Sequence, residues 1–185
     1  MLTFSSSRAW LLTGLGYWLI AGILGLILRL VKSGYLTGIP FQYFLHAHSH
    51  VAMLGWVYLA LITGIIYLVY GEKGFQFRFF SIVFWLTQVA VSGMLFTFPF
   101  QGYGAYSIAF STLHILVSYA FAIYIFRNWR TQTTHLGPLV RKFLSGSLVF
   151  MLLSSFGPWS LAYIGAQGLK DTHWYDHAIY FYLHF

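Results

Sequence analysis

Long apolar segments separated by short polar turns constrain this 185-residue sequence more than any other feature. A helix needs about 20 apolar residues to cross the hydrocarbon core of a bilayer. In that core the backbone polar groups must be satisfied within the segment, which favours helices. The sequence therefore predicts an all-α, polytopic transmembrane helical bundle with about six spans, at residues 10–31, 43–70, 79–98, 106–126, 143–164 and 174–185.

The composition supports one membrane domain that covers residues 1–185. Hydrophobic residues make up 59% of the chain and charged residues only 7%, whereas about a quarter of the residues in soluble domains are charged. The first apolar segment exceeds the apolar core of a cleaved signal peptide, so we expect it to stay as an anchor. The segment at 174–185 is too short to cross a bilayer, and we therefore expect the chain to be part of a longer protein.

The net charge of +7 predicts an orientation rather than a nucleic-acid partner. The basic residues are scattered singly between apolar segments and form no basic stripe, so we expect the lipid bilayer, and other membrane subunits, as partners and no nucleic acid. By the positive-inside rule the N-terminus is cytoplasmic, as in a multi-pass protein of the bacterial inner membrane. Seven basic residues fall on the N-terminal side, Arg8, Lys73, Arg78, Arg127, Arg130, Arg141 and Lys142, against Arg29, Lys32 and Lys170 on the other.

Three histidines in five residues, His46, His48 and His50, begin the second predicted span. Ionisable residues within membrane spans are rare and usually functional. From the predicted helix starts, His48, His114 and His184 lie on the order of 7 to 16 Å below the outer boundary, in one layer. The chain has no cysteine, so thiolate metal sites and covalently attached haem are excluded.

Helix geometry divides the three histidines between two faces. Each residue turns by about 100°, so His46 and His50 are nearly aligned and His48 points to the opposite side. Three ligands to one ion is poor geometry for a straight helix, whereas haem needs only one or two axial imidazoles and fits between apolar helices. The sequence therefore predicts cofactor ligands for b-type haem among His46, His48, His50, His114 and His184.

His48-Ser49-His50 followed by Leu54-Gly55-Trp56 resembles the His-x-His…Leu-Gly-Trp helix of the catalytic subunit of haem-copper oxidases, especially the C-type enzymes, and of nitric oxide reductases. The resemblance covers these nine residues, and the chain has no adjacent His-His pair. It implies a respiratory-chain oxidoreductase that reduces oxygen or nitric oxide. It also implies one or two b haems, with His48 on a high-spin haem and His50 on a low-spin haem, beside copper or non-haem iron.

Two alternative readings remain open. The first is a non-haem zinc or copper membrane protein, for which the candidate metal ligands are His48, His50 and His177; the neighbouring Asp176 would orient His177. The second is a structural accessory subunit in which the histidines only bond between helices. The sequence favours an enzyme but identifies no catalytic residue, and it leaves open whether a protein or a quinol is the electron donor.

Overall fold

The computed structural model describes residues 5–169 and 172–184, without the side chains of residues 165, 166, 183 and 184. Within these residues the chain is helical and contains no strand. Five of the described helical segments are long and apolar enough to cross a membrane: Ser7–Lys32, Phe41–Tyr70, Arg78–Gln101, Ala105–Arg127 and Pro138–Ile164. The structure therefore agrees with the all-α, multi-span prediction. The segment predicted at 174–185 coincides with α9 (His173–His184), which has only 12 residues.

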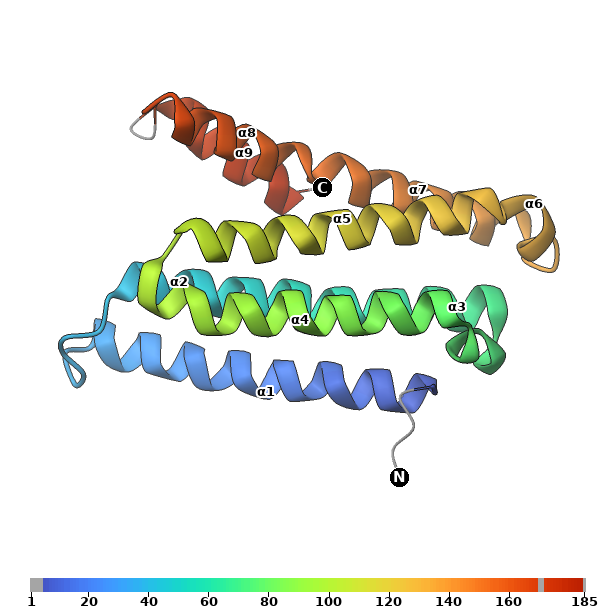
Figure 1. Ribbon diagram of the computed structural model, residues 1–185, viewed down its shortest axis with the longest axis horizontal. Coiled ribbons are helices and arrows are strands. Elements are labelled where there is room, and N and C mark those ends of the chain that lie inside the picture. Colours follow the sequence, from blue (N-terminus) through green and yellow to red (C-terminus); the bar gives the residue numbers. More distant parts are fainter. Residues whose placement is uncertain (1–4, 170–171, 185) are drawn as a thin grey trace. The chain divides into compact units, whose positions relative to one another are not determined.

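The chain forms two compact units, Met1–Val117 and Ser118–Phe185, and α5 (Ala105–Arg127) runs from the first into the second. In the first unit α1 (Ser7–Lys32) packs along one continuous 30-residue helix, which itself packs against α4 (Arg78–Gln101) (Figure 1). The continuous helix consists of three parts, α2 (Phe41–His50), the π-helical turns η1 (Val51–Val57) and α3 (Tyr58–Tyr70).

The helices of the first unit end where the sequence provides capping residues and glycines. The Ser6 side chain accepts a hydrogen bond from the Ala9 amide and caps the start of α1, as serine commonly does. Gly71 and Gly102 follow α3 and α4 with φ of +64° and +56°, in the left-handed region that L-residues with a side chain avoid. Glu72, in the short helix η2 (Glu72–Gln76), accepts a 2.9 Å hydrogen bond from the Ser7 amide.

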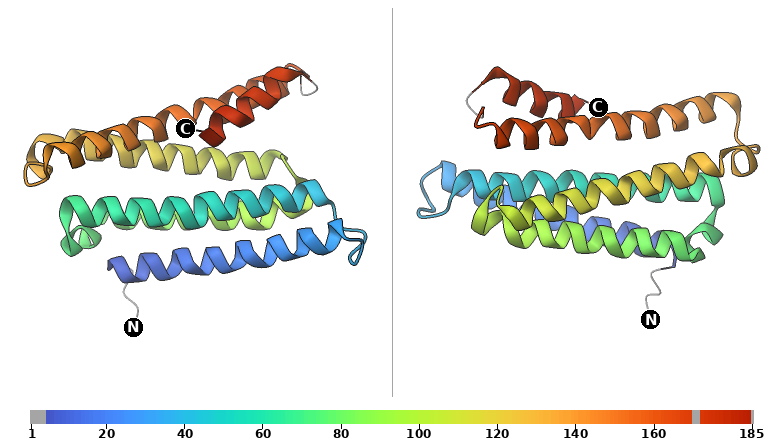
Figure 2. Two further views of the ribbon diagram at one scale, coloured as in Figure 1. Left: turned by 180° about the vertical axis from the view of Figure 1, so that it is seen from behind. Right: turned by 45° about the horizontal axis from the view of Figure 1, so that its top comes forward.

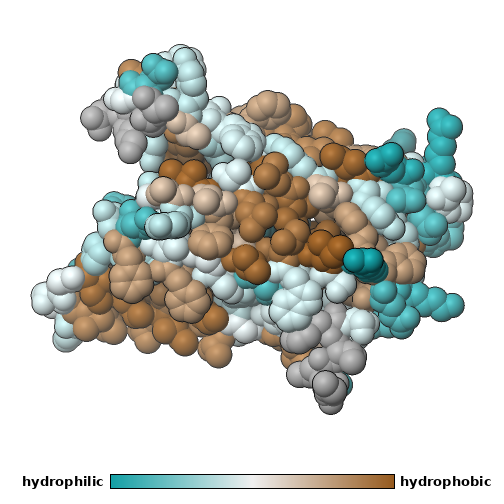
Figure 3. Space-filling view, viewed as in Figure 1, coloured by the Kyte–Doolittle hydropathy of each residue, from teal (hydrophilic) through white to brown (hydrophobic). Residues whose placement is uncertain are grey.

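The core of the first unit lies where α1, α2, η1 and α4 meet. Its buried members come from all four segments: Tyr17, Ala21, Leu24, Ala47, Val51, Val91, Met94 and Phe98. Gly55 in η1 is essential to this contact, because a Cβ there would lie only 2.8 Å from the Tyr17 ring and 3.0 Å from Val91. Apolar side chains such as Leu19 and Leu26 cover the outer face of α1 (Figure 3), as expected for a helix that contacts lipid.

In the second unit the remainder of α5 is followed by α6 (Trp129–Gln132), α7 (Pro138–Ser154), α8 (Phe156–Ala166) and α9 (Figure 2). The sequence indicates a kink at Gly157-Pro158, and α7 ends just before it, at Ser154. Proline explains this position, because its ring clashes with the carbonyl four residues earlier. Gly157 then lies in close contact with Ala178 and Tyr182 of α9, so α8 and α9 form a tight helical hairpin.

Gly55→Ala tests the close packing at η1. The added methyl group must displace Tyr17 or Val91, and overpacking of this kind costs about 1–3 kcal/mol. We expect Gly55→Ala to lower the thermal unfolding temperature of the detergent-purified protein, followed by circular dichroism. Gly64→Ala in α3 is the matched control, because nothing lies within 4 Å of its Cβ position. Equal unfolding temperatures for the two variants would contradict the described packing.

Candidate functional site

His50 is the histidine whose geometry is most fully defined. Its Nδ1 lies 2.9 Å from the carbonyl oxygen of His46 on the same helix. Because a carbonyl can only accept a hydrogen bond, Nδ1 carries the proton and the lone pair is on Nε2. The His50 ring packs on Phe98 of α4, with ring centroids 4.5 Å apart. The His50 Nε2 is therefore unprotonated, and the ring lies beside an aromatic side chain.

His46 lies on the same face of α2 as His50. Its ring meets Tyr103 edge to face at 4.5 Å between centroids, and Tyr103 also lies 5.1 Å from Phe98. Phe98 and Tyr103 therefore contact both histidines. We call these four residues, His46, His50, Phe98 and Tyr103, the His50 cluster.

His48 points to the other side of α2, toward α1. Its Nδ1 lies 2.9 Å from the Ala21 carbonyl oxygen. A Cβ on Gly25 would lie 3.1 Å from the imidazole Cε1, so the ring fits closely against the glycine backbone. The predicted division of the three histidines between two faces is confirmed, and His48 joins α2 to α1.

His114 of α5 lies further along the continuous helix than His50. Its buried ring meets Tyr58 at 4.5 Å between centroids and hydrogen-bonds the backbone of Leu54. Leu54 is one turn beyond His50, which corresponds to about 6 Å along the helix axis. His48 and Leu54 are six residues apart, about 9 Å along an ideal α-helix, which is also the width of the layer predicted from the sequence.

The remaining predicted ligands belong to the second unit. His184 is the last residue of α9, and its side chain lies outside the described part of the structure. His177 is exposed and lies edge-on to Trp174, with 6.3 Å between ring centroids.

The predicted metal set was His48, His50 and His177. Among the residues that the structure describes, no group of three or more His, Asp or Glu side chains is arranged to hold a metal ion. His48 and His50 themselves contact different helices, since His48 bonds to Ala21 of α1 and His50 packs on Phe98 of α4. The arrangement therefore offers single imidazoles rather than a chelating cluster.

Sequence analysis missed Phe98, Tyr103 and the π-helical turns of η1. Phe98 and Tyr103 flank the connection from α4 to α5, where Pro99 and Gly102 indicated only a turn. The structure brings Gly102 against the Tyr43 ring of the second helix. π-Helical turns occur frequently at functional sites, but no composition signal distinguishes Val51–Val57 from ordinary helix.

Comparison with known proteins returned no matching family model, no matching curated protein and no matching solved structure. The function of the His50 cluster must therefore be argued from the contacts of its own residues.

His48→Ala tests the link between α2 and α1. The variant loses the hydrogen bond to Ala21 and the packing on Gly25, and we expect a loss of about 1–3 kcal/mol in unfolding free energy. Ser49→Ala is the neighbouring control, because this exposed hydroxyl bonds only to carbonyls of its own helix, those of Leu45 and His46. Chemical denaturation in detergent compares the two, and an unchanged midpoint for His48→Ala would contradict the structural role.

Proposed function

We propose that the chain is a membrane b-type haem protein that transfers electrons, with His50 as an axial ligand. The observation that carries this proposal is the 2.9 Å hydrogen bond from His50 Nδ1 to the His46 carbonyl oxygen. Ligating histidines commonly donate their second ring N–H to a carbonyl or carboxylate, which fixes the tautomer and raises the basicity of the ligand nitrogen. His50 meets this requirement before any cofactor is bound.

The donor chemistry of the first unit suits haem better than a chelated ion. Haem needs one or two axial ligands and an apolar enclosure, and the His50 cluster supplies an imidazole beside two aromatic rings. His114 of α5 is the candidate for a second ligand, since it hydrogen-bonds the backbone of Leu54, one turn beyond His50. A zinc or copper site would require several converging ligands, and the described residues offer no such group.

When bound, the haem would supply reversible one-electron exchange at its iron. The residues of the chain hold and shield the group. The His46 carbonyl retains the Nδ1 proton of His50 and thereby directs Nε2 toward the ligand position. Phe98 and Tyr103 present apolar ring surfaces that exclude water from the His46 and His50 face.

We also propose that the chain is a relative of the catalytic subunits of haem-copper oxidases and nitric oxide reductases. Oxygen or nitric oxide would be the acceptor, and a protein or a quinol the electron donor. Seven of ten basic residues fall on one predicted side of the membrane, which supports a cytoplasmic N-terminus and the bacterial inner membrane as the location.

A structural accessory subunit is the second candidate. It is favoured by the observation that His48, His50 and His114 each hydrogen-bond a backbone group, at Ala21, His46 and Leu54 respectively. Such bonds between and within helices stabilise membrane bundles without a cofactor. The two candidates differ in whether the purified protein absorbs as a haem protein.

His50→Ala tests the haem proposal. The wild-type chain, expressed with ample haem and purified in detergent, should show a Soret band, and the pyridine haemochrome assay should identify b-type haem. Removal of groups that merely orient a ligand reduces metal affinity about 10–100-fold, so loss of the ligand itself should lower the haem-to-protein ratio at least about tenfold. His135→Ala, in the exposed turn after α6, should keep the wild-type ratio.

Imidazole added to His50→Ala separates ligation from a folding defect. A small imidazole can occupy the space that the missing ring leaves beside Phe98, and we expect it to restore the axially ligated spectrum. A colourless wild-type protein, or a His50→Ala variant with undiminished haem, would refute the proposal. A colourless but monodisperse wild type would favour the accessory subunit.

A further inference from the structure

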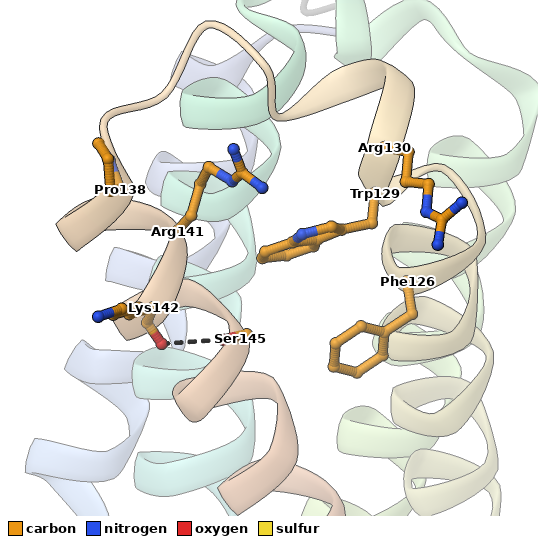
Figure 4. Close-up of a pocket in the computed structure, with 7 residues that line it drawn as sticks. All are labelled: Phe126, Trp129, Arg130, Pro138, Arg141, Lys142 and Ser145. Carbon is orange, nitrogen blue, oxygen red and sulfur yellow. Dashed lines mark hydrogen bonds between the residues drawn. The ribbon is translucent and has the colours of Figure 1, made fainter.

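The second unit contains an open cavity of about 550 Å³ where α5, α6 and α7 meet (Figure 4). Its walls come from the end of α5, from α6 and from the first two turns of α7: Phe126, Trp129, Arg130, Pro138, Arg141, Lys142 and Ser145. We call it the α6 pocket. None of these residues belongs to the His50 cluster, so the pocket requires its own explanation.

The α6 pocket is strongly positive. Three of its seven lining residues, Arg130, Arg141 and Lys142, are cations. No acidic residue occurs in the sequence between Glu72 and Asp171, so nothing in this part of the chain neutralises them locally. In Figure 4 the Arg141 guanidinium extends toward the Trp129 indole across the pocket. Guanidinium groups facing an open cavity favour a phosphate ligand, because they bind its oxygens through parallel hydrogen bonds.

The pocket also has an apolar side. Phe126 and Trp129 line it from α5 and α6, and the two long helices it joins are both apolar enough to span a membrane. On α7, Leu139 and Phe143 are 66% and 72% exposed. They lie one helical turn apart on the face of α7 opposite Arg141, so this end of α7 also has an apolar surface outside the pocket. Tryptophan at the end of a span is typical of the headgroup level of a bilayer.

We propose that the α6 pocket binds the phosphate headgroup of an anionic phospholipid, of the phosphatidylglycerol or cardiolipin class. Basic pockets between membrane helices commonly bind such headgroups. Free phosphate carries the same kind of charge but makes no apolar contact with Phe126 and Trp129, which line the pocket. A phospholipid would place its phosphate on Arg141 and its apolar part against Phe126 and Trp129.

The experiment uses the whole chain, reconstituted in phosphatidylcholine nanodiscs that contain a minor fraction of lipid with brominated acyl chains. Bromine quenches nearby tryptophan fluorescence. Brominated phosphatidylglycerol should quench more strongly than brominated phosphatidylcholine at the same fraction, and Trp129→Phe should remove the difference. This excess quenching, titrated against lipid fraction, gives an apparent affinity. Added salt should weaken it, because charge contributes to the attraction.

Arg141→Gln and Arg127→Gln separate the pocket from general surface charge. Each basic residue near an anionic lipid contributes about 1 kcal/mol, so Arg141→Gln should weaken the apparent affinity about fivefold. Arg127 lies at the end of α5 and is exposed but does not line the pocket, so Arg127→Gln should change it less than about twofold. Equal effects of the two substitutions would refute the pocket as the lipid-binding site and would indicate only nonspecific electrostatic attraction of the lipid.

Ser145→Phe keeps every charge while it fills the pocket, and it tests the proposal even if Arg141→Gln does not insert. The hydroxyl of Ser145 bonds only to the Lys142 carbonyl of its own helix. We expect Ser145→Phe to abolish the preference for phosphatidylglycerol. Preserved preference in this variant would overturn the proposal. Loss of the wild-type preference in millimolar inorganic phosphate, but not in equal millimolar chloride, would identify a free-phosphate site and would also overturn it.

Discussion

The first unit depends on the close approach of α1 to the continuous helix that contains α2, η1 and α3. Lipid supplies no hydrophobic drive for helices to associate, so association rests on tight packing of small residues and on polar bonds. The Trp56 ring packs on Gly14, where the indole Cε3 lies 3.1 Å from the position that a Cβ would take. The His48 ring packs on Gly25 in the same way. Gly55 completes the contact from the other helix, against Tyr17. Small residues on both helices therefore set the distance at which the histidines meet α1.

That packing assigns different tasks to neighbouring histidines. His48 joins α2 to α1, since its Nδ1 bonds to the Ala21 carbonyl and its ring packs closely against Gly25. His46 and His50 face the other way, toward the aromatic rings of Phe98 and Tyr103. Of the two, only His50 is anchored through Nδ1 to a carbonyl of its own helix. Our proposal accordingly rests on His50 and treats His48 as the residue that positions α2.

The helices were largely predictable from the sequence, because the length of each apolar segment and the glycine and proline residues between segments determine local structure. The break before Gly157-Pro158 and the two-sided arrangement of His46, His48 and His50 follow from backbone geometry alone. Tertiary contacts were not predictable in this way. Tryptophan near the end of a span usually lies at the membrane interface. Trp10, at the start of the first span, is instead fully buried between Phe75 and Phe84. Phe98 meets the histidines because α4 packs against α2, and Tyr103 meets them from the turn between α4 and α5. No periodic pattern in the sequence reveals either contact.

The central claim is that the His50 face holds a haem. The most direct measurement is the reduced-minus-oxidised difference spectrum of the purified wild-type chain, expressed with ample haem. We expect the absorption bands of a low-spin b-type haem if the His50 Nε2, left unprotonated by the bond of Nδ1 to the His46 carbonyl, holds the iron together with His114. A featureless difference spectrum from monodisperse, fully helical protein would contradict it.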